Sequence, residues 1–211
     1  EADPEAFPTD QPLLVATLPR RAGRPAAAVL GPASIISAAG MHRSFTDGRV
    51  VWCAGDISWP GMQIHGVLGP LALGHTCVLT EGTLDVPEPT RAWATLARHE
   101  VTTFISIPSV LRRMRTWVHD IVELPPVPAL RRVVTLGEPL DADLRAWVAA
   151  RLAGRPIDTA DGWGQMELGG MVVLDSLLEP SFAPDVGLQI VDDTGVPVPD
   201  GRSGELVLTR P

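Results

Sequence analysis

The stretch TADGWGQMELGG, Thr159 to Gly170, places an aromatic ring, an amide and a carboxylate between glycines. It follows the run Arg155 to Thr159, which we interpret as the end of a buried strand. Its side chains are then expected at the carboxyl edge of a sheet, where open α/β sheets bind their ligands. The alternative is a glycine-rich turn that leads into a strand over 171–174, because short motifs also arise by chance.

Three side chains of this stretch are suited to binding. Trp163 offers a flat face, and Gln165 offers both a hydrogen-bond donor and an acceptor. Glu167 supplies a carboxylate that can hold a hard cation such as Mg²⁺ with the help of substrate oxygens. On the ligand interpretation, these residue types indicate a site with Mg²⁺ as a candidate ion.

Outward from this stretch, apolar runs of strand length alternate with helical segments. The expected strands are 13–18, 49–54, 75–80, 101–106 and 130–136, and the expected helices are 32–45, a segment after 61, 89–99, a segment opening at 108, and 142–152. Strands that alternate with helices of about ten residues indicate a parallel sheet with right-handed crossovers. We therefore predict an α/β fold with a mostly parallel sheet flanked by helices.

The character of the chain changes after Gly170. Short strands are expected over 171–174, 186–191 and 205–209, separated by the turn sequences DDTG and PDGRSG. This pattern favours a small antiparallel β ribbon or partial barrel. The predicted organisation is a linker over 1–10, an α/β core over 11–170 and a β-rich part over 171–211.

Composition excludes several classes of protein. The chain has 211 residues, of which 45% are hydrophobic and 20% charged, as expected for a globular domain. No apolar run reaches the ~18 residues that a membrane span needs, and a net charge of −8 argues against nucleic acid as a partner. The acidic N-terminus EADPEAFPTD lacks the features of a signal peptide, so we expect a cytoplasmic protein.

The basic and sulfur-containing residues narrow the chemistry further. All 17 basic residues are arginine, so mechanisms that need a lysine are excluded for this chain by itself. Tyrosine is absent too. Cys53 and Cys77 give neither a disulfide framework nor a metal-ligand spacing, and their apolar surroundings favour buried thiols.

Four segments, in order, resemble the AMP-forming acyl-CoA synthetase and adenylation superfamily. DGWGQMELGG resembles its adenine- and phosphate-binding segment, which reads DTWWQTETGG in acetate-activating members. VTLGEPLDADLRAWV (134–148) resembles the adenine-binding GEP segment and the helix after it. WCAGDISWPGMQIHGVLGPLALGHTCVLTEG (52–82) and FISIPSVLRRM (104–114) are similar to the strands and helices that precede it. The chain is identified as a member on these segments, which implies the core of the superfamily's large domain.

The resemblance implies a set of site residues, with ATP or AMP and Mg²⁺ as cofactors. The residues implied in nucleotide binding are Gly137, Glu138, Pro139, Asp161, Gly162, Trp163, Gln165 and Met166. Those implied in the acyl pocket are Trp59, Pro60, Gly61 and Gly164, and Glu167 is implied as the Mg²⁺ ligand. Structural alternatives exist for Trp59 as a packed corner and for His65 as a satisfied core histidine rather than a base. The arginine cluster of Arg112, Arg113 and Arg115 is expected on a solvated helix face.

The sequence departs from the superfamily's pattern at the phosphate site. Residues 19–26, PRRAGRPA, stand where members read TSGSTGKPKG, so nearly every phosphate donor is missing. The three arginines of this segment either attract an anion or form a solvated turn. Met166 replaces a threonine whose hydroxyl contacts phosphate, and Gly164 replaces a tryptophan that closes the acyl pocket, which implies a deeper pocket.

These departures lead to three hypotheses. The first is a degenerate adenylation-like domain, inactive alone, that serves as a structural or docking element of a biosynthetic assembly line of the nonribosomal peptide or polyketide type. The second is a core piece of an active enzyme that converts a carboxylic acid to its acyl-AMP. The third is a non-catalytic module that binds AMP or CoA. The sequence ends before the superfamily's ribose-binding aspartate and small mobile domain, so we expect that domain to be absent.

Overall fold

The computed structural model describes residues 8, 10–18, 26–45, 48–176, 181–182 and 187–209. Most of the expected linker over 1–10 and the segment 19–25 lie outside the described residues. Among the described residues, no helix combines the length and the apolar character needed to cross a bilayer.

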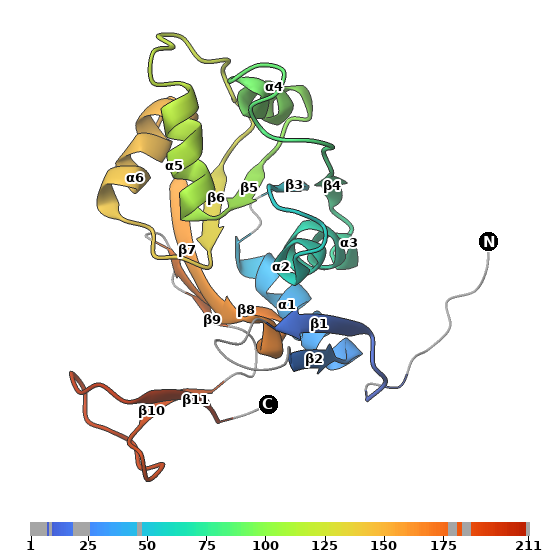
Figure 1. The fold of residues 1–211 in the computed structure, drawn as a ribbon, viewed down its shortest axis with the longest axis vertical. Coiled ribbons are helices and arrows are strands. Elements are labelled where there is room, and N and C mark those ends of the chain that lie inside the picture. The colour runs from blue at the N-terminus through green and yellow to red at the C-terminus, as the bar shows by residue number, and fades with distance from the viewer. Residues whose placement is uncertain are drawn as a thin grey trace.

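A seven-stranded sheet forms the centre of the molecule (Figure 1). Its strand order is β4-β3-β5-β6-β7-β8-β9. The strands are β3 (Val50–Cys53), β4 (Thr76–Val78), β5 (Thr103–Ser106), β6 (Arg132–Leu136), β7 (Asp158–Gln165), β8 (Gly170–Ser176) and β9 (Ser181–Phe182). The first five in spatial order are parallel, whereas β8 and β9 are antiparallel to their neighbours. This arrangement confirms the predicted α/β class with a mostly parallel sheet.

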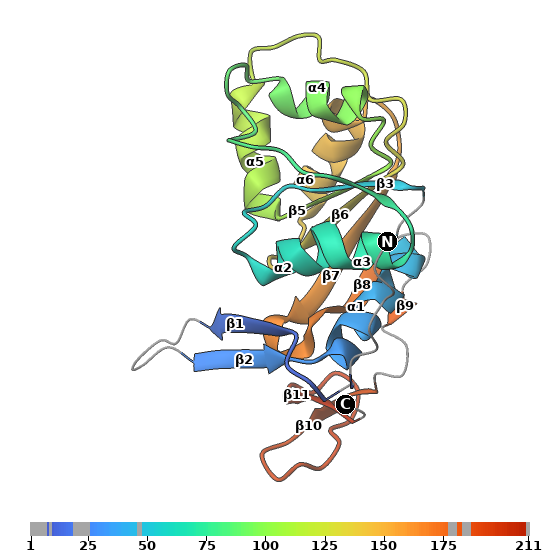
Figure 2. The ribbon, with the colours of Figure 1, turned by 90° about the vertical axis from the view of Figure 1, so that its right-hand side faces the viewer.

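Helices cover both faces of this sheet (Figures 1 and 2). They are α1 (Pro32–Phe45), α2 (Pro60–Met62), α3 (Gly69–Ala72), α4 (Arg91–Arg98), α5 (Pro108–Trp117) and α6 (Ala142–Trp147). A π-helical segment, η1 (Gln63–Leu68), joins α2 to α3, and a second, η2 (Val148–Leu152), continues α6. Asp141 caps α6 as its position suggests, because its Oδ1 accepts the backbone N–H of Leu144 at 2.8 Å.

Side chains along the buried strands point alternately to the two faces of the sheet, so the hydrophobic core consists of two clusters. Phe104 and Val133 pack with α4, α5 and α6 on one face, whereas their neighbours Ile105 and Val134 pack with Met41 of α1 on the other. Successive side chains of a strand point to opposite faces, so continuous apolar runs such as these indicate strands covered on both sides. Cys53 lies in the second core, and Cys53 and Cys77 are both unbridged thiols.

Two antiparallel pairs accompany the central sheet. β1 (Leu14–Leu18) pairs with β2 (Ala26–Leu30), and these strands flank the segment 19–25. β10 (Leu188–Val191) pairs with β11 (Glu205–Leu208), and Figure 1 shows this ribbon set apart from the central sheet. The ribbon agrees with the predicted antiparallel pairing near the C-terminus, but β8 belongs to the central sheet.

The predicted strand end at Arg155 to Thr159 is wrong. β7 begins at Asp158 and continues to Gln165, so more than half of the TADGWGQMELGG stretch is itself a strand. β7 pairs with β6 on one side and β8 on the other, and this pairing supplies the hydrogen bonds that outweigh the low strand propensity of glycine. A side chain at Gly162 or Gly164 would collide with Met171 or with the backbone of Gly170, so the glycines allow β8 to approach closely.

Candidate functional site

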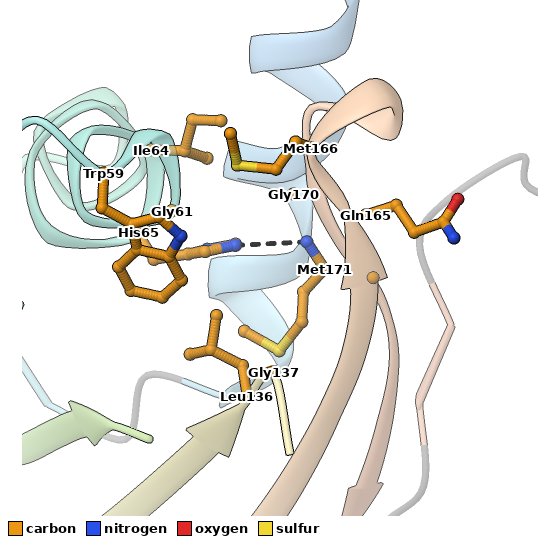
Figure 3. Close-up of a pocket in the computed structure, with 11 residues that line it drawn as sticks. Trp59, Gly61, Ile64, His65, Leu136, Gly137, Gln165, Met166, Gly170 and Met171 are labelled. Atoms are coloured by element: carbon orange, nitrogen blue, oxygen red, sulfur yellow. Dashed lines mark hydrogen bonds between the residues drawn. The ribbon is translucent and has the colours of Figure 1, made fainter. Parts of the chain in front are cut away.

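A cavity of about 150 Å³ lies between the α2–η1 helix, the end of β6 and the β7–β8 hairpin (Figure 3). Apolar side chains and glycines provide most of its wall. The lining residues are Trp59, Gly61, Ile64, His65, Leu136, Gly137, Gly164, Gln165, Met166, Gly170 and Met171. The cavity therefore brings together three of the four segments that resemble the superfamily. The segment that begins at Phe104 does not contribute.

Local sequence explains the helical side of the cavity. Pro60 opens α2, where its fixed φ and missing N–H suit the first helical position. Trp59 stands just before the helix, and its ring lies over Gly61, where an added Cβ would come within 2.5 Å of ring atom Cζ2. Trp59 thus forms the packed corner that its position before proline suggests, and it also lines the cavity.

A bulge shapes the opposite wall. The register of the β7–β8 pair shifts between Trp163 and Gly164, so that Gly164 faces Met171 and Val172 becomes an extra residue on β8. The backbone N–H of Met171 donates to Nε2 of His65 at 3.1 Å. A side chain from the helix therefore binds the backbone of the bulged strand across the cavity wall (Figure 3).

His65 continues this contact into a chain of two imidazoles. Its Nδ1 lies 3.1 Å from Nε2 of His42, and both rings are fully buried. Because Nε2 of His65 accepts the N–H of Met171, its proton belongs on Nδ1, which then donates to His42. Burial lowers the pKa of His65 to about 4, so the ring is neutral near pH 7. The interpretation of His65 as a satisfied core histidine agrees with these contacts.

The GEP segment is held by Asp161 of β7. Gly137 has φ +83°, a left-handed conformation that favours glycine, and it turns the chain at the end of β6. Asp161 accepts the hydroxyl of Thr135 at 2.8 Å and the backbone N–H of Leu140 at 3.0 Å. Its carboxylate therefore fixes the loop between Gly137 and Leu140.

Glu138 faces a neighbouring helix. Its carboxylate lies 3.2 Å from Arg112 of α5, and the same guanidinium lies 2.8 Å from Asp141. The hydrogen bond from Arg112 lowers the pKa of Asp141. Arg115 pairs with Asp143 at 2.6 Å. Arg112 and Arg115 are 42% and 41% exposed, so this face of α5 is solvated as predicted, and both side chains also link α5 to the start of α6.

The structure separates the sequence-predicted residues into two sets. Those that line the cavity are Trp59, Gly61, Gly137, Gly164, Gln165 and Met166. Those outside its lining are Pro60, Glu138, Pro139, Asp161, Gly162 and Trp163. Figure 3 shows the amide of Gln165 pointing away from the cavity. The side chain of Trp163 is 39% exposed on the adjacent part of β7, which leaves its ring open to solvent.

Sequence reasoning missed five lining residues: Ile64, His65, Leu136, Gly170 and Met171. Leu136 directly precedes the GEP segment, so its place at the carboxyl end of a strand was a usable signal. Met171 reaches the cavity only because the β8 bulge sets its register, and no local pattern predicts that shift.

The candidate metal ligand Glu167 lies in a 3₁₀ turn, η3 (Met166–Leu168), and is exposed. Across the part of the chain that the structure describes, no three His, Cys, Asp or Glu side chains come close enough to hold a metal ion. Mg²⁺ is commonly held by one or two carboxylates together with substrate phosphates. Glu167 fits that arrangement only with oxygens supplied by a nucleotide.

Known proteins of similar sequence show the family to which this chain belongs. Residues 22–211 match the family described as AMP-binding enzyme. The chain is 30% identical over 224 residues to the acetyl-coenzyme A synthetase of Streptomyces coelicolor, covering 100% of this chain and 34% of that protein. It is 29% identical to the acetyl-coenzyme A synthetase of Pyrobaculum aerophilum, covering 78% of this chain and 26% of that protein.

Solved structures show the same fold. An acyl-CoA synthetase from Brucella canis superposes with a TM-score of 0.78 at 21% identity, covering 99% of this chain and 39% of that one. The anthranilate CoA ligase AuaEII, in complex with anthranoyl-AMP, superposes with a TM-score of 0.76 at 20% identity, covering 93% and 38%. The chain spans about a third of the length of its first curated relative, and over that span it belongs to the AMP-binding enzyme family of acyl-CoA synthetase-like proteins.

Proposed function

We propose that this chain is the acyl-binding and adenine-facing part of an adenylate-forming protein, and that by itself it binds a carboxylic acid without activating it. The cavity carries this proposal. It brings together Trp59, Gly61 and Gly164, three of the four residues that the resemblance implies for an acyl pocket. Gly137 and Met166, at the same cavity, come from the two segments implied in nucleotide binding.

The expected lack of turnover follows from the charges that adenylation must manage. Joining a carboxylate to the α-phosphate of ATP brings two anions together, so donors and cations must neutralise them. The described residues that line the cavity include no arginine, and the sequence contains no lysine. Met166 offers a thioether, a weak acceptor, where a hydroxyl donor would be needed. Removing one such donor typically costs ~10²–10³ in rate.

The nucleotide would be held beside the cavity. The exposed ring of Trp163 and the turn at Gly137 offer flat and backbone surfaces for adenine, and Glu167 would share Mg²⁺ with phosphate oxygens. When bound, ATP would supply the adenylyl group that makes the acyl group transferable, with pyrophosphate as the leaving group. The chain's own residues then orient the acid, because Trp59 and Gly164 define where its acyl group lies.

Isotopic ATP–pyrophosphate exchange with a panel of short and medium carboxylic acids tests the proposal. Exchange is expected at background for this chain, while the same acids bind in equilibrium titrations. Met166→Thr is a useful variant because it restores the hydroxyl, and Met166→Leu is its matched control. Exchange above background with the unaltered chain would show that the chain activates acids by itself.

A docking role in a biosynthetic assembly line is a second proposal. Val15 and Val29 face each other in the β1–β2 register and are 63% and 58% exposed, which leaves an apolar surface open to a partner. Sedimentation velocity of the chain mixed with a carrier-protein module should then show a complex that Val15→Asp weakens. A mixture that sediments as two separate species would contradict this role.

A further inference from the structure

The described side chains that line the cavity are poor in hydrogen-bond acceptors. Among the described residues that line it, only Trp59, His65 and Gln165 have side chains that contain nitrogen or oxygen. The indole of Trp59 is a donor only. Figure 3 shows the Gln165 amide pointing away from the cavity. Ile64, Leu136, Met166 and Met171 contribute apolar groups or weakly accepting thioethers, and Gly61, Gly137, Gly164 and Gly170 contribute backbone to the wall.

His65 does not make up for this lack, because its acceptor is already in use. Its Nε2 accepts the backbone N–H of Met171 at 3.1 Å, and its Nδ1 lies 3.1 Å from His42. A ligand that carried an amine here would have to displace one of these contacts or remain without a side-chain acceptor. Either outcome carries the desolvation penalty of an unpaired buried polar group.

The size of the cavity sets a second limit. Its volume is about 150 Å³. An apolar cavity of about 150 Å³ in another protein stays dry and binds benzene, so this volume suits a single ring or a chain of similar bulk. It cannot enlarge toward β8 at Gly164, because the backbone of Gly170 lies against that residue.

We propose that the cavity selects a carboxylic acid whose acyl group is apolar and about the size of a benzene ring, and that it discriminates against amino substituents on that group. This inference rests on the proposed function and specifies its substrate class. Benzoic acid and unbranched acids of about six carbons belong to that class. Acetate leaves the cavity partly empty, and dodecanoate exceeds it.

Displacement of 4-fluorobenzoate from the chain, followed by ¹⁹F NMR, tests this selection. Benzoate and hexanoate are expected to displace the reporter at concentrations at least about tenfold lower than acetate or dodecanoate, because one methylene of misfit in an apolar pocket is worth about 10–200-fold. The acids 4-methylbenzoate and 4-aminobenzoate have nearly the same size. The methyl compound is expected to bind at least about tenfold more tightly than the amino compound, because only the amine needs an acceptor.

Variants at Met166, which is half-buried, test the cause. Met166→Gln adds an acceptor to the wall and is expected to reduce the preference for 4-methylbenzoate, whereas Met166→Leu keeps the preference. Met166→Trp fills the cavity and is expected to abolish reporter binding. Leu71→Trp makes the same kind of change at a side chain that is 57% exposed on α3 and should leave binding unchanged.

The outcomes distinguish an error in the substrate class from an error in the proposed acyl-binding function. If acetate or dodecanoate displaces the reporter better than benzoate, or if 4-aminobenzoate equals 4-methylbenzoate, the substrate class is wrong while acid binding stands. If no acid binds, including the reporter, the proposed acyl-binding function is itself wrong, provided that circular dichroism shows a folded chain.

Discussion

At the scale of single residues, the site depends on groups that have little freedom to change. Gly164 lies where an added Cβ would overlap the backbone of Gly170, and no side-chain rearrangement relieves such a contact. The β7–β8 bulge therefore requires glycine at this position, where the superfamily's acetate-activating members have tryptophan. A larger residue here would move the strand rather than simply close the cavity.

Gly164→Ala is predicted to reduce the free energy of unfolding by about 3 kcal/mol, at the upper end of the usual cost of overpacking. Gly74→Ala is the matched control. Gly74 has φ +71° but no atom within 4 Å of an added Cβ, so only the backbone strain of about 1–2 kcal/mol applies. Urea denaturation of both variants measures the difference. Equal costs would show that β8 does not press against Gly164.

The buried imidazoles predict a dependence of stability on pH. Burial lowers the pKa of His65 from 6.5 to about 4, and burial together with His65 and His75 lowers that of His42. The unfolded chain then binds protons below pH 6.5 that the folded chain does not bind, so stability is full above pH 6.5 and falls as the pH drops toward 4. The shift at His65 corresponds to roughly 3 kcal/mol.

Urea unfolding at several values of pH between 7 and 4 measures this loss. His65→Gln is expected to flatten the decline between pH 6.5 and pH 4. His99→Gln, at an exposed histidine, is the control and should follow the unaltered chain. A decline of the same size in His65→Gln would mean that other groups account for it.

At the scale of elements, ion pairs fix how β6, β7, α5 and α6 meet. Arg132 of β6 and Asp158 of β7 are opposite each other in the register and form an ion pair, with side chains only 12% and 4% exposed. The pair at Arg115 and Asp143 is much more exposed, at 41% and 81%. The buried Arg132–Asp158 pair is therefore important for the stability of the fold, whereas water screens the exposed Arg115–Asp143 pair.

Asp158→Ala is predicted to destabilise the chain by about 3–5 kcal/mol, because it leaves the guanidinium of Arg132 buried without its carboxylate. Asp143→Ala is the matched control, for which a much smaller change is expected. Thermal unfolding followed by circular dichroism compares the two. If both variants melt together, the Arg132–Asp158 pair does not secure the β6–β7 register.

At the scale of the whole molecule, the sequence predicts elements better than it predicts contacts. Apolar runs and the prolines at 32 and 108 indicate the strands and helix starts that the structure contains. β7 was misplaced because the glycines in DGWGQ argue against a strand, whereas pairing with both β6 and β8 stabilises one. Tertiary pairing overrides local propensity at such a position.

For the candidate site too, the sequence predicts which residues lie near one another better than it predicts the contacts of their side chains. Motif resemblance identified Trp59, Gly61 and Gly164 as neighbours across more than 100 residues of sequence, and the structure brings them to one cavity. It assigned Asp161 to the nucleotide, which stays a prediction, but it did not predict that this carboxylate accepts the hydroxyl of Thr135 and the N–H of Leu140. The direction of a side chain depends on what surrounds it, and a linear pattern does not contain that information.

The central claim is that the cavity between η1 and the β7–β8 hairpin binds the acyl group of a carboxylic acid. Methyl-labelled methionine NMR tests it most directly, because the chain has five methionines at distinct places. On titration with benzoate, the methyl signals of Met166 and Met171, which line the cavity, are predicted to shift, while that of Met114, in the core on the other face of the sheet, stays fixed. Unmoved Met166 and Met171 signals at saturating benzoate would contradict the claim.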